Sequence, residues 1–380
     1  MNILVDENIA YATEAFGTLG KVYKLPGRKI TSQHLSDIDC LIVRSVTQIN
    51  RNLLGSASTS FVGTTTIGTD HFDVNFLKDR GITFSSSPGC NSQAVAEYVF
   101  SAILNIASAQ KRSLKNKTIG IIGYGNIGKK VVKLCTIIGL KVIINDPPLE
   151  ETENNFSYSS LNEVLKADII TLHVPYTSEG KYKTHYLIDK KEIEKIKENT
   201  ILINTSRGSV VNNEALKNAL REKRLSTIFD VWENEPDLSK ELLEQIDIAT
   251  QHIAGYSLEG KVNGTKIIYD KLCKFLDKEI SWEPKLPKVS NNVFHYSSNN
   301  NLFTNLNNFT KVISHLEEDT LELKKATKLN SKELSNYFDK LRKNYKLRRE
   351  FSNYTILLEK GNIEIEETLN QIGFKTVATI

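Results

Sequence analysis

The stretch Thr118–Asp146, TIGIIGYGNIGKKVVKLCTIIGLKVIIND, decides the fold, because it places two apolar runs on either side of a glycine-rich turn and a helix-compatible segment. The first run leads into Gly123-Tyr124-Gly125-Asn126-Ile127-Gly128, and the second ends at Asp146. A G-x-G-x-x-G turn between a strand and a helix, followed about 20 residues later by a carboxylate, is the pattern of a dinucleotide-binding βαβ unit. The stretch therefore predicts a Rossmann-type domain.

Each part of this turn has a physical task. The glycines permit a tight turn and a close approach of the backbone to a pyrophosphate, and Asn126 and Ile127 lie where the helix N-terminus attracts that charge. Asp146 accepts hydrogen bonds from ribose hydroxyls and repels a 2′-phosphate. It is followed by Pro147 and Pro148 rather than by Arg or Lys, so the sequence favours NAD over NADP. The alternative is a structural turn in which Asp146 caps a helix.

Short apolar runs alternate with helix-compatible segments on both sides of this unit. In the first 90 residues the predicted strands are Ile3–Val5, Lys21–Leu25, Cys40–Val43, Ser60–Val62 and Ile82–Phe84. In the second series they are Thr118–Ile122, Lys141–Asn145, Asp168–His173, Thr200–Asn204, Thr227–Asp230 and Asp247–Ala249. A long helix is expected over Asn91–Ala109, with one apolar stripe. This alternation indicates βαβ crossovers and an α/β fold with two doubly wound parallel-sheet domains.

The character of the chain changes after the proline-containing stretch Trp282–Pro287, which predicts a linker. An Asn/Ser-rich run over Ser290–Asn308 follows, then helix-like segments, then two predicted strands at Tyr354–Leu358 and Thr376–Thr379. These features predict a small α+β domain at residues 287–380.

One helix of this tail is predicted from Ser331 to about Lys346, with Asn330 and Glu333 spaced as a capping box. Its apolar face comprises Leu334, Tyr337 or Phe338, Leu341 and Tyr345. The segment 331–350 holds seven basic and three acidic residues, which matches the net charge of +4 of the whole chain. Two interpretations stay open for this charge: a solvated helix face, or a contact with an anion or phosphate.

Composition limits the class of protein. With 25% charged and 40% hydrophobic residues over 380 positions, the chain resembles an ordinary globular protein, and nothing indicates a nucleic-acid partner. The N-terminus lacks a basic signal region, and the longest apolar stretch, Tyr98–Ala107, is too short to cross a bilayer, so no membrane partner is expected. The four cysteines form no C-x-x-C pair, so we expect no metal site and a reduced, cytoplasmic protein.

Three candidate catalytic residues follow predicted strands: Arg207 in TSRG, Glu235 in DVWENEP, and His252. Open parallel sheets bind their ligands at the carboxyl ends of strands, where these residues are expected to meet. An arginine offers a planar fork for a carboxylate, and a histidine offers a base near neutral pH that a carboxylate can orient. Each residue alone has an ordinary structural explanation. Together they suit hydride chemistry on a hydroxy acid.

At these motifs the sequence resembles the D-isomer-specific 2-hydroxyacid dehydrogenases. The matching stretches are Ile121–Gly128, Asn204–Val211 (NTSRGSVV), Asp230–Pro236 (DVWENEP) and His252–Gly255 (HIAG). The resemblance implies that Arg207 binds the substrate carboxylate, Glu235 partners the histidine, and His252 exchanges the hydroxyl proton. It also assigns Asp146, Pro175, Asp230 and Gly255 to NAD. Gln251 is a departure, since the family usually has proline there, and this puts the rigidity of the loop in doubt.

The resemblance further implies three domains: a flavodoxin-like substrate-binding domain at 1–95 and 255–286, the NAD-binding domain at 96–254, and a C-terminal dimerisation domain at 287–380. A closer resemblance within the family is carried by IVRSVT (42–47), GTTTIGTD (63–70), PGCN (88–91), HIAGYSLEGK (252–261) and the tail segments FDKLR (338–342) and YKLRREF (345–351). It implies a phosphorylated small-molecule substrate and a homodimer.

The substrate residues that this closer resemblance implies are Ser45, Thr66 and Tyr256. From the residues alone, Arg44 and Ser45 follow a predicted strand and are candidates to hold a phosphate, while Thr64–Thr66 offer hydroxyl donors. Two alternatives stay open: a related dehydrogenase acting on another phosphorylated hydroxy acid, and a non-enzymatic NAD(H)-sensing corepressor or scaffold.

Overall fold

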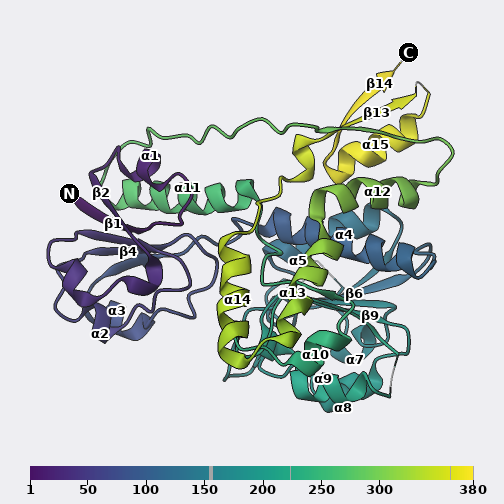
Figure 1. Cartoon of the computed structure of the whole chain (residues 1–380), viewed down its shortest axis with the longest axis horizontal. Helices are drawn as coiled ribbons and strands as arrows, with labels where there is room; N and C mark the ends of the chain where they lie inside the picture. Colours follow the sequence, from purple (N-terminus) through teal and green to yellow (C-terminus); the bar gives the residue numbers. More distant parts are fainter. Residues whose placement is uncertain (154–156, 223, 360, 380) are drawn as a thin grey trace. The chain divides into compact units, whose positions relative to one another are not determined.

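The structure is a computed structural model that describes residues 1–153, 157–222, 224–359 and 361–379 (Figure 1). It divides into two compact units. The first unit comprises Met1–Asn91 and Ser257–Lys288, and the second comprises Ser92–Tyr256 and Val289–Ile380. The C-terminal segment thus belongs to the same compact unit as the predicted NAD-binding domain, and the division into three domains stays a prediction.

The first unit is built on a five-stranded parallel sheet of order β2-β1-β3-β4-β5. Its strands are β1 (Asn2–Asp6), β2 (Lys21–Leu25), β3 (Cys40–Val43), β4 (Phe61–Thr64) and β5 (Thr83–Ser85). Its helices are α1 (Ala12–Phe16), α2 (Arg51–Leu54), α3 (Val74–Asp79) and α11 (Leu258–Phe275). This strand order is the flavodoxin-like one, as predicted for this part of the chain.

Alternation along β1 distributes side chains to the two faces of this sheet. Ile3 and Val5 belong to a core cluster that contains Ile268 and Tyr269 of α11. Leu4 belongs to the other cluster, which contains residues of α2 and α3. Both faces are therefore covered, which explains why the strands appear in the sequence as nearly continuous apolar runs.

The second unit contains a six-stranded parallel sheet of order β11-β10-β9-β8-β6-β7. Its strands are β6 (Thr118–Ile122), β7 (Lys141–Asn145), β8 (Ile169–Leu172), β9 (Ile201–Asn204), β10 (Ser226–Phe229) and β11 (Ile248–Ala249). Its helices are α4 (Ser92–Ala109), α5 (Asn126–Ile137), α6 (Pro147–Glu150), α7 (Leu161–Val164), α8 (Lys190–Lys195), α9 (Asn213–Ala219) and α10 (Lys240–Gln245). The order reverses at β6, as in a doubly wound Rossmann-type sheet, and the predicted α/β fold is confirmed.

The C-terminal segment adds a three-stranded parallel sheet of order β12-β13-β14. Its elements are β12 (Val293–His295), α12 (Leu302–Ser314), α13 (Leu316–Lys324), α14 (Ser331–Lys343), β13 (Thr355–Glu359), α15 (Ile363–Ile372) and β14 (Lys375–Thr379). Strand β12 was not predicted, because its three residues lie within the Asn/Ser-rich run. The capping box of α14 is present, with Asn330 and Glu333 exchanging side chain and backbone hydrogen bonds.

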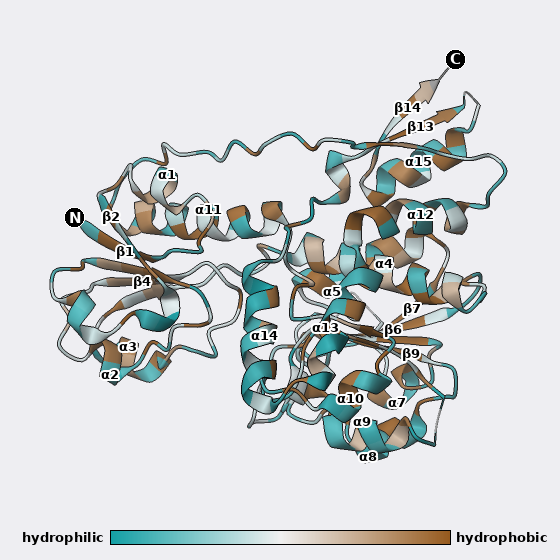
Figure 2. Cartoon of the chain, in the orientation of Figure 1, coloured by the Kyte–Doolittle hydropathy of each residue, from teal (hydrophilic) through white to brown (hydrophobic). Residues whose placement is uncertain are grey.

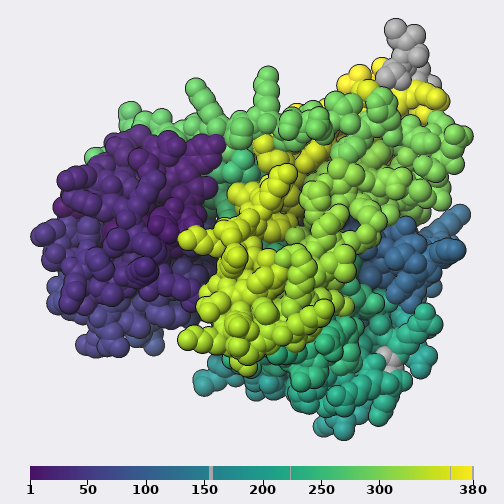
Figure 3. Space-filling view, viewed as in Figure 1, coloured from purple at the N-terminus to yellow at the C-terminus, as the bar shows by residue number. Residues whose placement is uncertain are grey.

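The C-terminal segment shares its apolar core with the NAD-binding sheet. Leu334 and Phe338 of α14 are buried in one cluster with Ile122 and Phe229. In the space-filling view, the yellow-green atoms of α13 and α14 lie directly against the teal atoms of this sheet domain (Figure 3). The predicted apolar face of α14 is therefore covered by its own chain.

Helix α4 is buried on more than the one stripe that its sequence predicted. The polar residues Glu97, Ser101 and Asn105 are buried too. Asn105 donates to Glu317 of α13 at 3.0 Å, and both carboxyl oxygens of Glu97 accept the backbone N–H of Phe351. The C-terminal segment thus covers polar residues of α4 that lie outside the predicted apolar stripe.

The polarity of the chain follows this layering. The strands are mostly brown and the outer helix faces mostly teal in the hydropathy view (Figure 2). Among the residues described, no helix is both long enough and apolar enough to cross a membrane. The four cysteines are free and buried, and burial raises the pKa of the Cys40, Cys90 and Cys135 thiols to about 12.

Candidate active site

The glycine turn after β6 has the geometry that a bound pyrophosphate requires. Gly123 has a φ of +96°, and an added Cβ would lie 2.8 Å from the backbone carbonyl carbon of His173. A Cβ on Gly128 would lie 2.1 Å from the Gly123 oxygen, so this glycine allows α5 to pack closely on the turn. A Cβ on Gly125 would meet no described residue other than its chain neighbours within 4 Å, which leaves open space beside the backbone at the N-terminus of α5. The residues present therefore fit a dinucleotide.

Asp146, at the end of β7, is tied to this turn. Its Oδ2 accepts the backbone N–H of Tyr124 at 2.7 Å, and its Oδ1 accepts that of Leu149 at 3.1 Å as the N-cap of α6. The helix cap considered from the sequence is thus present. It does not exclude a contact with ribose, because each carboxylate oxygen has two lone pairs. Each of the two hydrogen bonds uses one lone pair of its oxygen, and the other lone pair remains for a ribose hydroxyl.

The loop after β8 lies at the point where the strand order reverses. β8 pairs with β6, so His173 and Pro175 follow the strand beside the glycine turn. His173 is buried, and its burial lowers the imidazole pKa to about 3, so the ring is neutral. Its Nε2 is 3.0 Å from Thr171 Oγ1, and its buried Nδ1 has no hydrogen-bond partner among the residues described. An unpaired polar atom at this edge is consistent with a ligand site.

The loop that carries Arg207 is braced from beneath by Asn204, the last residue of β9. Asn204 Oδ1 accepts the N–H and hydroxyl of Ser206 at 3.1 and 2.8 Å, and its amide donates to the Arg207 carbonyl at 3.0 Å. A Cβ on Gly208 would lie 1.9 Å from the carbonyl carbon of Trp232. The Arg207 loop therefore packs directly on the backbone of the segment that leads to Glu235.

Glu235 and His252 form a hydrogen-bonded pair. Glu235 Oε2 lies 2.8 Å from His252 Nδ1, and Glu235 Oε1 accepts the Trp232 N–H at 2.8 Å. The side chains are 19% and 35% exposed, respectively. Burial raises the pKa of Glu235, but His252, Arg342 and the Trp232 N–H outweigh this effect and leave the pKa below its usual value. The carboxylate therefore stays ionised and leaves His252 Nε2 available to exchange a proton.

Asp230, at the end of β10, holds the loop that follows His252. Its carboxylate accepts the N–H groups of Ile253 and Ala254 at 2.7 and 2.8 Å and the hydroxyl of Thr250 at 2.6 Å. Burial raises the pKa of this carboxyl, and His252 and the hydrogen bonds oppose the rise. The resemblance assigns Asp230 and Gly255 to NAD. In the structure, Asp230 is already engaged in shaping the loop that carries both His252 and Gly255.

Arg348 holds the opposite side of the same loop. It is 7% exposed, and its guanidinium donates to the carbonyls of Ile253 at 3.0 Å, of Ala94 at 2.9 Å, and of Ala254. Asp230 thus accepts the N–H groups of Ile253 and Ala254, and Arg348 donates to the carbonyl groups of the same two residues. This arrangement makes the C-terminal segment part of the support of the candidate site.

The contacts of Asp230 and Arg348 with this loop matter for the rigidity of the chain around Gln251, where the family usually has proline. Gln251 is 2% exposed, and its Oε1 has no hydrogen-bond partner among the residues described. His252 follows with a φ of +59°, in the left-handed region. The loop lacks the rigidity of a proline, but the contacts of Asp230 and Arg348 fix the two residues after His252.

The remaining candidate substrate residues of the N-terminal stretch lie in the first unit. Arg44 Nε lies 2.9 Å from Oδ2 of the buried Asp6, and Arg44 Nη2 lies 3.4 Å from Oδ1, so this guanidinium is engaged in an ion pair. Ser45 is exposed. Thr66 Oγ1 is 2.7 Å from Thr64 Oγ1. Of the predicted substrate residues, Tyr256 lies in the second unit with the Glu235–His252 pair.

The lysines of residues 331–350 differ in exposure from Arg342 and Arg348. Lys332, Lys340, Lys343 and Lys346 are exposed, as the solvated-face interpretation predicts. Arg342 and Arg348 instead turn inward, toward Tyr256 and the His252 loop. Sequence reasoning missed both as site residues. The tail segments FDKLR and YKLRREF contain them, but their spacing gives no sign of the distant loop that they contact.

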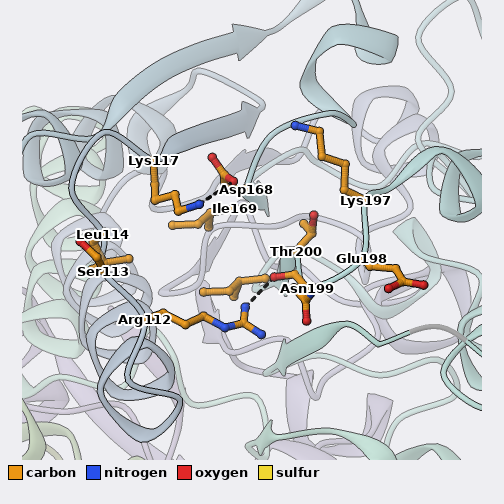
Figure 4. Close-up of a pocket in the computed structure, with 11 residues that line it drawn as sticks. Arg112, Ser113, Leu114, Lys117, Asp168, Ile169, Lys197, Glu198, Asn199 and Thr200 are labelled. Atoms are coloured by element: carbon orange, nitrogen blue, oxygen red, sulfur yellow. Dashed lines mark hydrogen bonds and ion pairs between the residues drawn. The ribbon is translucent and has the colours of Figure 1, made fainter.

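A cavity of about 490 Å³ lies at the opposite edge of the six-stranded sheet (Figure 4). It is lined where β6, β8 and β9 begin, by residues that include Lys117, Asp168 and Thr200. Arg112 points across it to the Asn199 carbonyl, and Lys117 pairs with Asp168 at 3.3 Å. Ligands of open parallel sheets bind at the carboxyl ends of strands, so we do not assign this cavity to catalysis.

Comparison with protein families agrees with this geometry. Residues 95–254 match the NAD binding domain of the D-isomer specific 2-hydroxyacid dehydrogenases, and residues 285–373 match a domain of unknown function (DUF3410). The strand order, the glycine turn and the full-length relatives described next define an NAD-dependent dehydrogenase, and the chain belongs to the D-isomer specific 2-hydroxyacid dehydrogenase family.

Full-length relatives carry a more specific name. The erythronate-4-phosphate dehydrogenase of Wigglesworthia glossinidia brevipalpis is 43% identical, over 99% of this chain and 98% of its own. Those of Proteus mirabilis and Escherichia coli K12 are 41% and 40% identical, over 98% and 99% of this chain and 99% of their own.

Solved structures share the fold over about three quarters of the chain. D-Lactate dehydrogenase from Aquifex aeolicus, complexed with NAD and lactic acid, is 26% identical with a TM-score of 0.61, and the match covers 73% of this chain and 96% of that one. NAD⁺-bound 3-phosphoglycerate dehydrogenase from Entamoeba histolytica has a TM-score of 0.63 at 24% identity, over 75% of this chain and 99% of that one.

Proposed function

We propose that this chain catalyses the NAD-dependent oxidation of 4-phospho-D-erythronate to 2-oxo-3-hydroxy-4-phosphobutanoate, a step in the synthesis of pyridoxal 5′-phosphate. The observation that carries the chemistry is the 2.8 Å contact between Glu235 and His252 at the same sheet edge as the glycine turn. The substrate is supported by the full-length relatives, which are named erythronate-4-phosphate dehydrogenases.

In the proposed reaction, Arg207 holds the substrate carboxylate and orients the C2 carbon. His252 Nε2 accepts the proton of the C2 hydroxyl, and Glu235, through Nδ1, stabilises the imidazolium that forms. NAD, when bound, would supply the acceptor for the hydride of C2. The substrate thus loses a proton and a hydride and becomes the 2-oxo acid.

The residues proposed to hold NAD are those of the glycine turn together with Asp146, Pro175, Asp230 and Gly255. The open space beside Gly125 gives room for the pyrophosphate at the N-terminus of α5. Asp146 supplies acceptors for the ribose, with its position fixed by the Tyr124 N–H. Ser45, Thr66 and Tyr256 are proposed to contact the substrate.

A turnover assay tests the function. We expect NAD-dependent oxidation of 4-phospho-D-erythronate with a kcat/KM at least about tenfold above that for 3-phosphoglycerate, which corresponds to about 1.4 kcal/mol in the transition state. A preference for 3-phosphoglycerate would assign the chain to the related reaction. No turnover of either substrate, with NAD binding intact, would favour a non-enzymatic NAD-sensing role.

We also propose a cytoplasmic homodimer formed through residues 287–380. The apolar face of α14 is covered by the chain itself, so the contact is assigned to the small sheet and α15. There Val293, Val377 and Ile363 are 48%, 49% and 67% exposed. Light scattering of the full chain should give the dimer mass, and the pair of changes Ile363→Glu and Val377→Glu should give the monomer mass. A monomeric unmodified chain would contradict the proposal.

A further inference from the structure

Arg342 lies in the last turn of α14, one turn after the buried Phe338. Because Leu334 and Phe338 fix α14 on the NAD-binding sheet, the position of Arg342 is set by a packed core and not by a loop. Helix neighbours at i and i+4 lie on the same face, so Arg342 is directed inward with Phe338. The adjacent Lys343, one position further, is exposed.

The guanidinium of Arg342 lies among aromatic groups of the candidate site. Its central carbon is 5.8 Å from the ring centre of Tyr256 and 5.8 Å from that of Phe338, both within cation–π range. Its Nη2 donates to the Tyr256 hydroxyl at 3.3 Å. Tyr256 is four residues from His252 along the loop that Asp230 and Arg348 hold.

One donor of this guanidinium is unused. The Nε atom of Arg342 is buried and has no hydrogen-bond partner among the residues described. Leaving a buried charged donor unpaired costs free energy, so such an atom calls for an explanation, and an absent ligand is one. Burial lowers the pKa of Arg342, but Tyr256, Glu235 and Asp230 outweigh it, so the side chain stays charged.

The charges of the proposed substrate require more than one cationic group. Arg207 accounts for the carboxylate at one end. At the other end is a phosphate monoester, and the guanidinium of Arg44 already pairs with the buried Asp6. An arginine with an unpaired donor beside a substrate tyrosine has the chemistry that a phosphate needs.

We propose that Arg342, together with the Tyr256 hydroxyl, binds the phosphate of the substrate and thereby sets the preference for a phosphorylated 2-hydroxy acid. The proposal rests on the proposed function and deepens it. It gives the C-terminal segment, which matches a domain of unknown function, a direct contact with the substrate. Arg342 would then act as a specificity residue, distinct from Arg348, whose hydrogen bonds to the carbonyls of Ala94, Ile253 and Ala254 support the His252 loop.

The test compares Arg342→Met, Arg342→Lys and the control Lys343→Met, with 4-phospho-D-erythronate and with D-erythronate, at saturating NAD. For Arg342→Met we expect kcat/KM for the phosphorylated acid to fall by about 10–100-fold, as for the loss of a charged hydrogen bond. Activity on D-erythronate should fall by a much smaller factor, because His252 and the Trp232 N–H still favour the ionised form of Glu235. Arg342→Lys should raise KM more than it lowers kcat, and Lys343→Met should match the unmodified chain with both substrates.

Equal losses with the two substrates would overturn the proposal and make Arg342 a charge partner of Glu235. Unchanged kcat/KM with both would also overturn it. Calorimetry with inorganic phosphate on the NAD-saturated proteins gives a readout without turnover: Arg342→Met should bind phosphate at least tenfold more weakly. If the unmodified chain binds phosphate but does not oxidise phosphoerythronate, the proposed function fails while the Arg342 site is still decided by this measurement. If Arg342→Met does not fold, Arg342→Lys decides through its ratio of activities on the two acids.

Discussion

Replacing Glu235 by glutamine tests the pairing at the centre of the site through a constraint that the structure imposes. The backbone N–H of Trp232 donates to Glu235 Oε1, and this donor cannot turn away. A glutamine must therefore keep its carbonyl oxygen at that position. Its amide nitrogen then lies where Oε2 now meets His252 Nδ1, at 2.8 Å.

An amide N–H facing Nδ1 requires Nδ1 to be the acceptor, so the proton of the neutral imidazole moves to Nε2. The Nε2 atom can then no longer take the hydroxyl proton of the substrate. General base catalysis is commonly worth about 10²–10⁴-fold, or about 2.7–5.5 kcal/mol in activation free energy. We expect Glu235→Gln to lower kcat by that factor, while the Kd for NAD changes less than about twofold.

Stopped-flow measurement of reduced cofactor in a single turnover, with a parallel NAD titration, measures both quantities. The matched control is Glu233→Gln, since Glu233 lies on the same loop and its Oε2 accepts the Asn213 N–H at 3.1 Å. A Glu235→Gln protein that transfers hydride within about threefold of the unmodified rate would refute the tautomer argument. An equal loss in Glu233→Gln would show that any change of charge on this loop is harmful.

Three further changes have definite expectations. Arg348→Lys should lower the free energy of unfolding by about 2–4 kcal/mol, because one ammonium cannot donate to the carbonyls of Ala94, Ile253 and Ala254 at once. Chemical denaturation measures this, and a loss under about 0.5 kcal/mol would contradict the stabilising role given to Arg348. Asp146→Ala should raise the Kd for NAD and reduce the ratio of the Kd for NADP to that for NAD, and parallel titrations with the two cofactors measure both constants. An unmodified chain that binds NADP more tightly than NAD would disprove the argument that the Asp146 carboxylate repels a 2′-phosphate. Burial and Glu350 raise the pKa of Glu97 well above its usual value, so the stability that the protonated carboxyl contributes is full below about pH 4.3 and is lost as the pH rises. The free energy of unfolding of Glu97→Gln, relative to that of the unmodified chain, should therefore rise as the pH increases from 5 to 8 in a series of denaturation measurements. A difference between the two proteins that stays constant over this range would contradict the prediction.

Much of the fold was predictable because the sheets are buried on both faces. A strand covered on both sides is a nearly continuous apolar run, so β3 and β6, which are buried over almost their whole length, were predicted with the bounds that the structure has. The bounds predicted for β2 and β7 match as well, although most residues of β2 are exposed. The missed strand, β12, pairs only with β13 at the rim of the small sheet, and two of its three residues are exposed. Its sequence carries little of the apolar signal that identified the others.

Some residues of the candidate site could be predicted from the sequence and others could not. Arg207, Glu235 and His252 could be proposed together because each follows a strand of one parallel sheet, and such strand ends share an edge. Arg342 and Arg348 could not, because they reach Tyr256 and the loop of residues 253–254 from more than 80 residues away in the sequence. Only the packing of α14 on the sheet brings them there.

The central claim is that hydride leaves C2 of a phosphorylated hydroxy acid while His252 takes the hydroxyl proton. The most direct measurement uses 4-phospho-D-erythronate carrying deuterium at C2, incubated with NAD and the full chain, followed by mass spectrometry of the reduced cofactor. We predict one deuterium per reduced cofactor and a 2-oxo acid without it, with the rate of label transfer reduced at least about 100-fold in His252→Asn. Unlabelled reduced cofactor, or label transfer at the full rate in His252→Asn, would contradict the account.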